Sequence, residues 1–140
     1  MVRTLLSSIV IALWLVTVGI VVSAQNPADG WTIPATAAAE KNPFPANEAV
    51  LAAGKKVFSS KCVRCHGPAG KGDGPDADGE HKEDMDLTRA DRAARNPDGV
   101  VFYKVWNGRQ SPRMPNFEDQ LSKEQAWAVV TFVQTLRKKS

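Results

Sequence analysis

Both cysteines of the chain lie in one short stretch, Lys61–Gly67, which reads KCVRCHG. Cys62 and Cys65 are separated by two residues, and His66 follows directly. Two thiols at this spacing can form a disulfide, act as a redox dithiol, bind a metal with further ligands, or attach a prosthetic group covalently. The first three uses assign no particular function to His66, so the remainder of the chain has to decide between them.

The alternatives to covalent attachment each face an objection. A thioredoxin-like dithiol belongs in a βαβ unit, and the sequence shows no strand-period alternation. A zinc site needs four ligands, and only His66 and His81 remain to join the thiols. The pattern CxxCH, in contrast, is typical of haem attachment, in which both thiols form thioethers and the histidine ligates the iron. We therefore predict one covalent haem c at Cys62, Cys65 and His66, with a disulfide as the simplest alternative.

The first 24 residues have the pattern of an export signal. Arg3 precedes an uncharged run from Leu5 to Val22, and small residues lie before a cleavage point at Gln25. The uncharged run is also long enough to span a bilayer, so an uncleaved N-terminal membrane anchor is the alternative to a cleaved signal peptide. In both cases we expect the rest of the chain in the periplasm. An uncleaved segment would anchor it to the outer face of the inner membrane. Haem attachment in bacteria also occurs outside the cytoplasm.

Composition divides the chain and limits its function. The segment 25–46 is rich in proline and alanine and predicts a linker or arm, whereas residues 47–140 predict one domain. A domain of this size has a modest core and often gains stability from a bound group. The formal net charge of +3 is too small for the basic footprint of a nucleic-acid-binding protein.

Helical patterns dominate the region that must position the cysteines. Gly, Pro and Asp residues make 67–86 a predicted loop, and a capping box at Ser122 and Gln125 opens the last helix. The first helix ends just before the cysteines, and the predicted fold class is all-α with helices at both ends and long loops between. The predicted helices cover about residues 48–60, 89–95, 97–106 and 123–137. Their expected N-terminal capping residues are Asn47, Thr88, Asn96 and Ser122.

In this context the chain resembles a monohaem class I c-type cytochrome, of the bacterial type that also occurs as a domain of oxidases and dehydrogenases. The resemblance covers about residues 47–138 and rests on four segments in order, GKKVFSSKCVRCHG, GKGDGP, VWNGRQSPRMPNF and LSKEQAWAVVTFVQTL. It implies the class I cytochrome c fold, in which the first and last helices cross closely. Gly54 and Phe58 would then face the region of Trp127, Val130 and Phe132.

The resemblance also implies a second axial ligand for the iron. In this family a methionine followed by proline supplies it, and here that residue is Met114, 48 residues after His66. Met85 and His81 are the competing candidates and lie nearer to His66 in the sequence. We favour Met114 because its whole context, WNG followed by MP, matches the family.

Further haem contacts are implied less directly. The family uses a proline carbonyl to orient the histidine ring, and Pro75 is the best match. Donors to the haem propionates are expected among Trp106, Asn107, Arg109 and Arg113. Each of these four also has an ordinary structural explanation, as a core tryptophan, a helix-stop asparagine or a solvated arginine.

These features predict a periplasmic electron carrier and not an enzyme. With His66 and Met114 on its two faces, the iron has no open position for a substrate. The expected partners are redox proteins such as a dehydrogenase or an oxidase, with no nucleic acid, and a membrane only if the N-terminal segment stays uncleaved. Two alternatives remain, a haem subunit fixed in a larger dehydrogenase or oxidase complex, and a haem enzyme or gas-binding protein with a labile sixth ligand.

Overall fold

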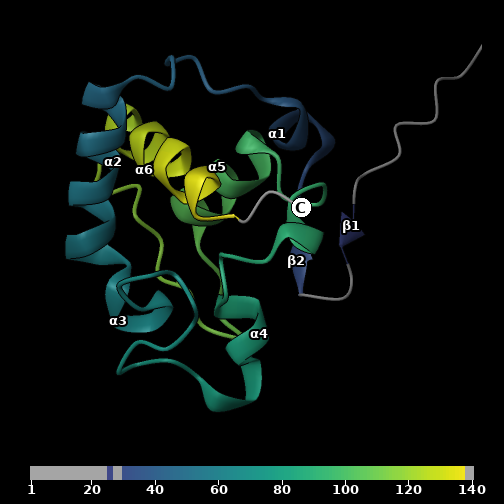
Figure 1. Cartoon of the computed structure of the whole chain (residues 1–140). Helices are drawn as coiled ribbons and strands as arrows, with labels where there is room; N and C mark the ends of the chain where they lie inside the picture. The colour runs from purple at the N-terminus through teal and green to yellow at the C-terminus, as the bar shows by residue number, and fades with distance from the viewer. Residues whose placement is uncertain (1–24, 27–29, 138–140) are drawn as a thin grey trace, which may run out of the picture.

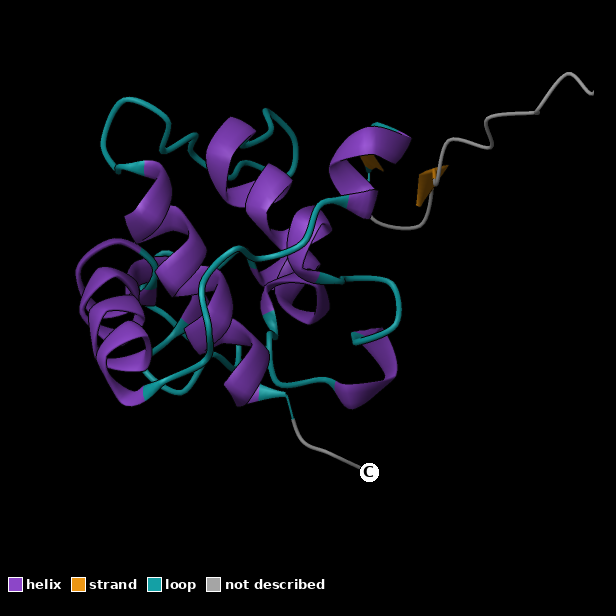
Figure 2. Cartoon of the chain, turned by 90° about the horizontal axis from the view of Figure 1, so that it is seen from above, coloured by secondary structure: helices purple, strands orange, loops and turns teal. Residues whose placement is uncertain are grey.

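The computed structural model describes residues 25–26 and 30–137, shown as a cartoon in Figure 1. The predicted export signal, residues 1–24, lies outside the described residues. Within the described ranges, short strands form a single antiparallel pair at the edge of a mainly helical molecule (Figure 2), which confirms the predicted all-α class. The elements are β1 (Gln25–Asn26), β2 (Trp31–Thr32), α1 (Ala35–Ala39), α2 (Glu48–Lys61), α3 (Val63–His66), η2 (Gly79–His81), α4 (Lys82–Met85), η3 (Ala90–Arg92), α5 (Asp98–Asn107) and α6 (Lys123–Leu136).

The first long helix and the last helix lie side by side, as Figure 1 shows for α2 and α6. Gly54 makes this close approach possible, because a Cβ there would collide with the carbonyl oxygen of Ala128 and lie 2.9 Å from the Cβ of Phe132. Phe58 packs its ring 5.2 Å from that of Phe132. The predicted crossing of the two terminal helices is therefore confirmed.

Local hydrogen bonds define the ends of both helices. The side chain of Asn47 accepts from the backbone N–H of Val50 at the start of α2, as predicted. Ser122 and Gln125 form the predicted capping box at the start of α6. Such caps supply partners to backbone N–H groups that have none within the helix, and each contributes on the order of 1 kcal/mol to stability.

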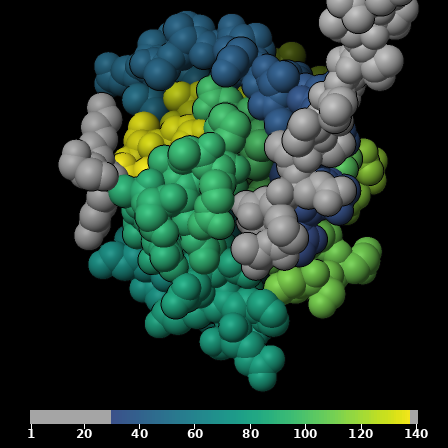
Figure 3. Space-filling view, turned by 90° about the vertical axis from the view of Figure 1, so that its right-hand side faces the viewer, coloured from purple at the N-terminus to yellow at the C-terminus, as the bar shows by residue number. Residues whose placement is uncertain are grey.

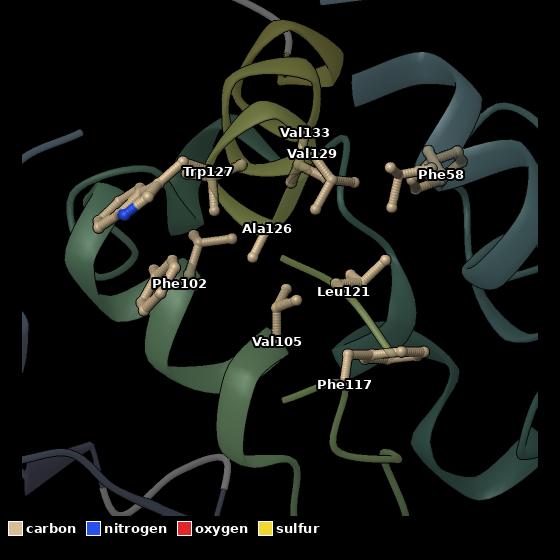
Figure 4. Packing of buried hydrophobic residues seen from close by; sticks show 12 residues of the cluster. Phe58, Phe102, Val105, Phe117, Leu121, Ala126, Trp127, Val129 and Val133 are labelled. Atoms are coloured by element: carbon tan, nitrogen blue, oxygen red, sulfur yellow. The ribbon is translucent and has the colours of Figure 1, made fainter. Parts of the chain in front are cut away.

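The main hydrophobic core fills the space between α2, α5 and α6, and Figure 4 shows its packing. The ring of Trp127 stacks on Phe102 with centroids 4.1 Å apart, which joins α6 to α5. Ala126 and Val130 on α6 are completely buried. The remaining buried members of this cluster are Val57, Phe58, Val101, Val105, Phe117, Leu121, Val129 and Val133.

In the N-terminal arm, residues 30–46 pack on the helical domain. Trp31 and Ile33 are buried with Val100 of α5, and α1 lies against the same helix. In the space-filling view, residues 30–46 of the arm run over the surface of the molecule (Figure 3). Asn42 attaches its far end, because the side-chain amide donates to the carbonyl oxygen of Trp127 and to the hydroxyl of Thr131.

The middle of the chain differs from the sequence-based prediction in three places. The predicted loop 67–86 contains the short helices η2 and α4, and the helix predicted at 89–95 is only the 3-10 turn η3. Thr88 does not cap that turn, because its hydroxyl donates to Asp86. Asn96 does not cap α5 either, since its amide donates to the carbonyl of Arg92 and accepts from Lys104. Tertiary and neighbouring partners outcompete the caps at both positions.

None of the helices in the described ranges combines the length and the apolar character that crossing a membrane requires.

Candidate functional site

A pocket of about 790 Å³, counted to its open mouth, brings together residues that are far apart in the sequence. Cys62, His66 and Met114 all line it. Apolar side chains from α2, α5 and α6 form much of its wall, as is typical of cofactor sites. The apolar members are Phe58, Leu87, Val101, Val105, Val129 and Val133. The polar members are Asp84, Asp86, Arg89, Arg92, Asn96, Lys104 and Arg137.

The CxxCH motif forms one helical turn at the end of α2. The backbone N–H of His66 donates to the carbonyl of Cys62 at 3.0 Å, so Cys62 and Cys65 lie one turn apart, as expected. Both thiols are half-buried and are not joined in a disulfide. Burial, together with the nearby Cys65, raises the pKa of the Cys62 thiol to about 12. A reactive redox dithiol requires the opposite shift, which argues against that use of the pair.

A backbone carbonyl orients the ring of His66. Its Nδ1–H donates to the carbonyl oxygen of Met85 at 2.7 Å, and burial lowers the pKa of the imidazole below its ordinary value. The ring is therefore neutral, and Nε2 carries the lone pair that a metal ligand needs. The sequence-based expectation named the carbonyl of Pro75 instead, but Pro75 is exposed and the carbonyl that accepts from the His66 ring is that of Met85 in α4.

Met114 lies in the loop between α5 and α6, which we call the Met114 loop (residues 108–116). Its backbone forms both hydrogen bonds of an antiparallel bridge with Arg109, at 2.8 and 2.9 Å. Gly108 opens the loop with a φ of +61°, and a Cβ there would collide with the backbone of Met114 and Asn116. The half-buried side chain of Met114 contacts both hydrophobic clusters as well as the pocket.

Met85 and His81, the competing candidates for the second ligand, lie elsewhere. Met85 is buried and contributes its carbonyl to His66, whereas its side chain is not part of the pocket lining. His81 pairs through Nδ1 with Asp78 at 2.8 Å on the surface of η2. Neither side chain lines the pocket formed by the described residues, and Met114 does.

One end of the pocket is cationic and fits the carboxylates of a haem. Arg92 Nε is buried and has no hydrogen-bond partner among the described residues, although Nη1 of the same guanidinium donates to Asp84. Arg137 also lies at this end, donates to the carbonyl of Asn96 at 2.7 Å, and has its pKa lowered by burial. An unsatisfied buried donor among such cations is expected where an anionic group binds.

The four residues expected from the sequence to contact propionates lie outside this lining in the described structure. Trp106 stacks on Phe102 at 5.5 Å, and Asn107 donates to the carbonyl of Tyr103. Arg109 stacks on Trp31, and Arg113 is exposed. The cations that line the pocket are instead Arg92 and Arg137, with Arg89, Asn96 and Lys104 beside them, and the propionate contacts of the four residues stay a prediction. The available sequence signal is the three arginines within the seven residues after DLT, and residue type alone does not separate a solvated arginine from one that lines a pocket.

Comparisons with known proteins agree with this geometry. The family model described as Cytochrome c matches residues 51–137. A chain of the Kuenenia stuttgartiensis reducing HAO-like protein complex Kustc0457/Kustc0458 is similar in structure, with a TM-score of 0.58 and 30% identity. That match covers 69% of this chain and 47% of the other, so the present chain spans less than half of it.

A second solved structure, the KustC0563 c-type cytochrome, has a TM-score of 0.50 and 24% identity, and the match covers 61% of this chain and 98% of that one. At this identity the likeness concerns the fold alone. None of the curated proteins matches the chain.

The family implies covalently attached haem c, for which Cys62, Cys65 and His66 supply the attachment motif. Since the matched region covers more than half of the chain and includes this motif, the chain belongs to the cytochrome c family.

Proposed function

We propose that the protein is a periplasmic single-electron carrier whose iron is ligated by His66 and Met114. One observation supports this function above the others. The imidazole of His66, with a free Nε2, and the thioether of Met114 line a single pocket, although the two residues are 48 positions apart in the sequence. Cys62 lines the same pocket. When bound, haem c supplies an iron that gains and loses one electron. A thioether on the second face favours the ferrous state and leaves no position open for a substrate.

The residues of the pocket support electron transfer without chemistry on a substrate. The apolar wall excludes water, which disfavours the additional charge of the ferric state. The carbonyl of Met85 fixes the tautomer and the direction of His66, so that the ligand needs little movement when the charge of the iron changes. Arg92 and Arg137 would hold the propionates at the polar end of the pocket.

The periplasmic location and the export signal are part of the same proposal. The pattern of residues 1–24 supports them, with a cleavage point before Gln25 or, alternatively, retention as a membrane anchor. Mass spectrometry of the protein from a periplasmic extract tests this proposal. A mass of residues 25–140 plus one haem is expected, and a haem-free full-length chain in the cytoplasm would contradict it.

A second candidate function is that of a haem subunit in a larger redox complex. The similar chain of a reducing HAO-like protein complex favours it. Size-exclusion chromatography of native extracts separates the two candidates. A haem peak at the mass of the monomer supports a free carrier, whereas co-elution with a large partner supports the complex subunit.

The ligand assignment is tested with two methionine variants of the ferric holoprotein. Met114→Leu should abolish the sulfur-to-iron charge-transfer absorption band, because leucine offers no ligand atom. Met85→Leu is the matched control and should retain the band, since it preserves volume and the orienting carbonyl is in the backbone. A band that survives Met114→Leu would refute the assignment. A five-coordinate iron in the wild type would instead favour a haem enzyme or a gas-binding protein.

A further inference from the structure

We propose that the N-terminal arm controls the stability of the iron–methionine bond, because Trp31 and Arg109 hold the Met114 loop in place. This inference rests on the proposed ligation by Met114. It assigns a positioning function to Trp31, a residue that lies outside the region matched by the family model, residues 51–137. The argument follows the contacts from the arm to the ligand.

The first contact joins the arm to the start of the Met114 loop. The guanidinium of Arg109 lies over the ring of Trp31, 4.8 Å from its centroid, and Trp31 is only 8% exposed. At Gly30, a Cβ built on the backbone would lie 3.5 Å from Nη1 of Arg109 and 3.8 Å from the carbonyl of Ser111. The arm therefore covers the first half of the loop, and a partly buried cation–π contact of this kind is stronger than an exposed one.

The second contact joins Arg109 to the ligand. Its backbone pairs with Met114 in both directions, and its Nε donates to the carbonyl of Pro112 at 2.7 Å. Both ends of the loop are thus attached to a single residue. A displacement of Arg109 would consequently displace the backbone of Met114 as well.

The side chain of Met114 contacts the arm's own cluster directly. Met114 packs against the cluster of Trp31, Ile33 and Val100, while its other neighbours belong to the main core. Lys104 of α5 also lies over the ring of Trp31, 5.2 Å from its centroid. Trp31 therefore contacts both α5 and the Met114 loop, and it supports the loop in addition to the main core.

The arm itself is firmly attached, so it can serve as a support. Close packing of α1 on α5 requires Gly99, because a Cβ there would collide with the carbonyl oxygen of Ala37. Asn42 holds the other end of the arm to α6 through two hydrogen bonds. Trp31 thus approaches the loop from a fixed segment and not from a loose end.

This arrangement has a measurable consequence for ligand exchange. An external ligand can bind the iron only in molecules whose Met114 has dissociated, so its apparent affinity scales with that fraction. If Trp31 and Arg109 stabilise the closed loop, their removal increases the dissociated fraction. The apparent affinity for an external ligand then increases by the same factor.

Imidazole binding to the ferric full-length holoprotein measures that factor. The loss of the sulfur-to-iron charge-transfer band monitors the binding. Trp31→Ala should increase the apparent affinity for imidazole about tenfold, the scale of a lost partly buried cation–π contact. Trp31→Phe retains a ring face for Arg109 and should restore most of the wild-type value. Arg109→Met also removes the hydrogen bond to Pro112, so it should increase the affinity at least as much as Trp31→Ala. The double variant should increase it by less than the product of the two single effects, because both substitutions remove the shared cation–π contact.

Phe44→Ala is the matched control for a general loss of stability. Phe44 is a half-buried aromatic residue of the same arm that packs on the main core. This substitution should lower the melting temperature but change the imidazole affinity less than about twofold.

An unchanged affinity in both Trp31→Ala and Arg109→Met would overturn the proposal, as would an equal increase in Phe44→Ala. If one of these outcomes occurs while the wild type shows the sulfur-to-iron band and Met114→Leu abolishes it, the support by Trp31 is refuted and the ligation by Met114 stands. If the wild type shows no such band, the ligation by Met114 fails and this inference fails with it.

Discussion

The two sides of the pocket are built in different ways. On the His66 side, both attachment residues and the ligand lie within five consecutive positions on one helical turn, directly after α2. On the Met114 side, the ligand lies in a loop whose support comes from Trp31, 78 positions before Arg109. One side depends on local sequence and proposed covalent attachment, and the other on noncovalent tertiary contacts.

The two sides of the pocket should therefore differ in how strongly they resist substitution. The His66 side should fail only when its attachment or its helix is disrupted, because covalent bonds and a helical turn fix its geometry. Single substitutions should weaken the Met114 side gradually, since each noncovalent contact contributes only about 1–2 kcal/mol. Substitutions on the two sides can therefore test the comparison separately.

The largest effect is expected from removing both tethers on the His66 side. Cys62→Ala combined with Cys65→Ala should abolish covalent haem completely, because no thioether can form. Intact-mass measurement after denaturation checks this, with Ser59→Ala on the exposed face of α2 as control. If the double variant still carried haem mass after denaturation, the attachment assignment would be wrong.

A smaller effect is expected at the helix crossing that supports the His66 side. Gly54→Ala should lower the free energy of unfolding by about 1–3 kcal/mol, because the new methyl group meets the backbone of Ala128. Chemical denaturation of the holoprotein measures it. Gly79→Ala is the control, since a Cβ there has no neighbour within 4 Å among the described residues.

The same variant sharpens the comparison between the two sides. Gly54 lies away from the Met114 loop, so Gly54→Ala should leave the apparent imidazole affinity of the ferric protein close to that of the wild type. A large increase in affinity would show that the two sides are coupled through the core, and the comparison would fail.

The smallest effect concerns an exposed ion pair next to the CxxCH turn. Arg64 donates to Asp76 at 2.6 and 3.0 Å, and these hydrogen bonds lower the pKa of the Asp76 carboxyl below its ordinary value. A carboxyl with a lowered folded pKa stabilises the protein above its unfolded pKa, and this contribution is lost as the pH falls through the folded value. Both side chains are exposed, so the contribution should be small and sensitive to salt.

Thermal melting of the wild type and Asp76→Asn tests this sign. The difference in melting temperature should be present at about pH 5 and should shrink towards about pH 3. Asp119→Asn, an exposed acid between Met114 and α6, serves as the control. A difference that stays constant over this range would contradict the linkage.

The predictions from sequence that were confirmed depend on neighbours in the chain. The caps at Asn47 and Ser122 need partners only three residues away, and the CxxCH turn needs one helical turn. The helix crossing at Gly54 was also predicted from the sequence, through the family resemblance. A glycine destabilises the interior of a helix, and the close approach of a second helix explains its presence there.

The prediction that was wrong, and those that stay untested, involve groups whose type carries no positional signal. Every residue has a backbone carbonyl, so the sequence could not identify Met85 over Pro75 as the acceptor for His66. Arginines are equally ambiguous, since a long side chain reaches a pocket or the solvent depending on the fold around it. Arg92 is directed to the pocket and Arg109 to Trp31 by the fold around them.

The sequence by itself determined the attachment motif, the helical class and the family, because these depend on residue types at short and regular spacing. Only the tertiary structure brought Met114 and His66 to one pocket, selected the cations at its polar end, and placed Trp31 against the Met114 loop. These contacts join segments far apart in the chain. Their energies arise from burial and packing around a shared core, which no local pattern of residues encodes.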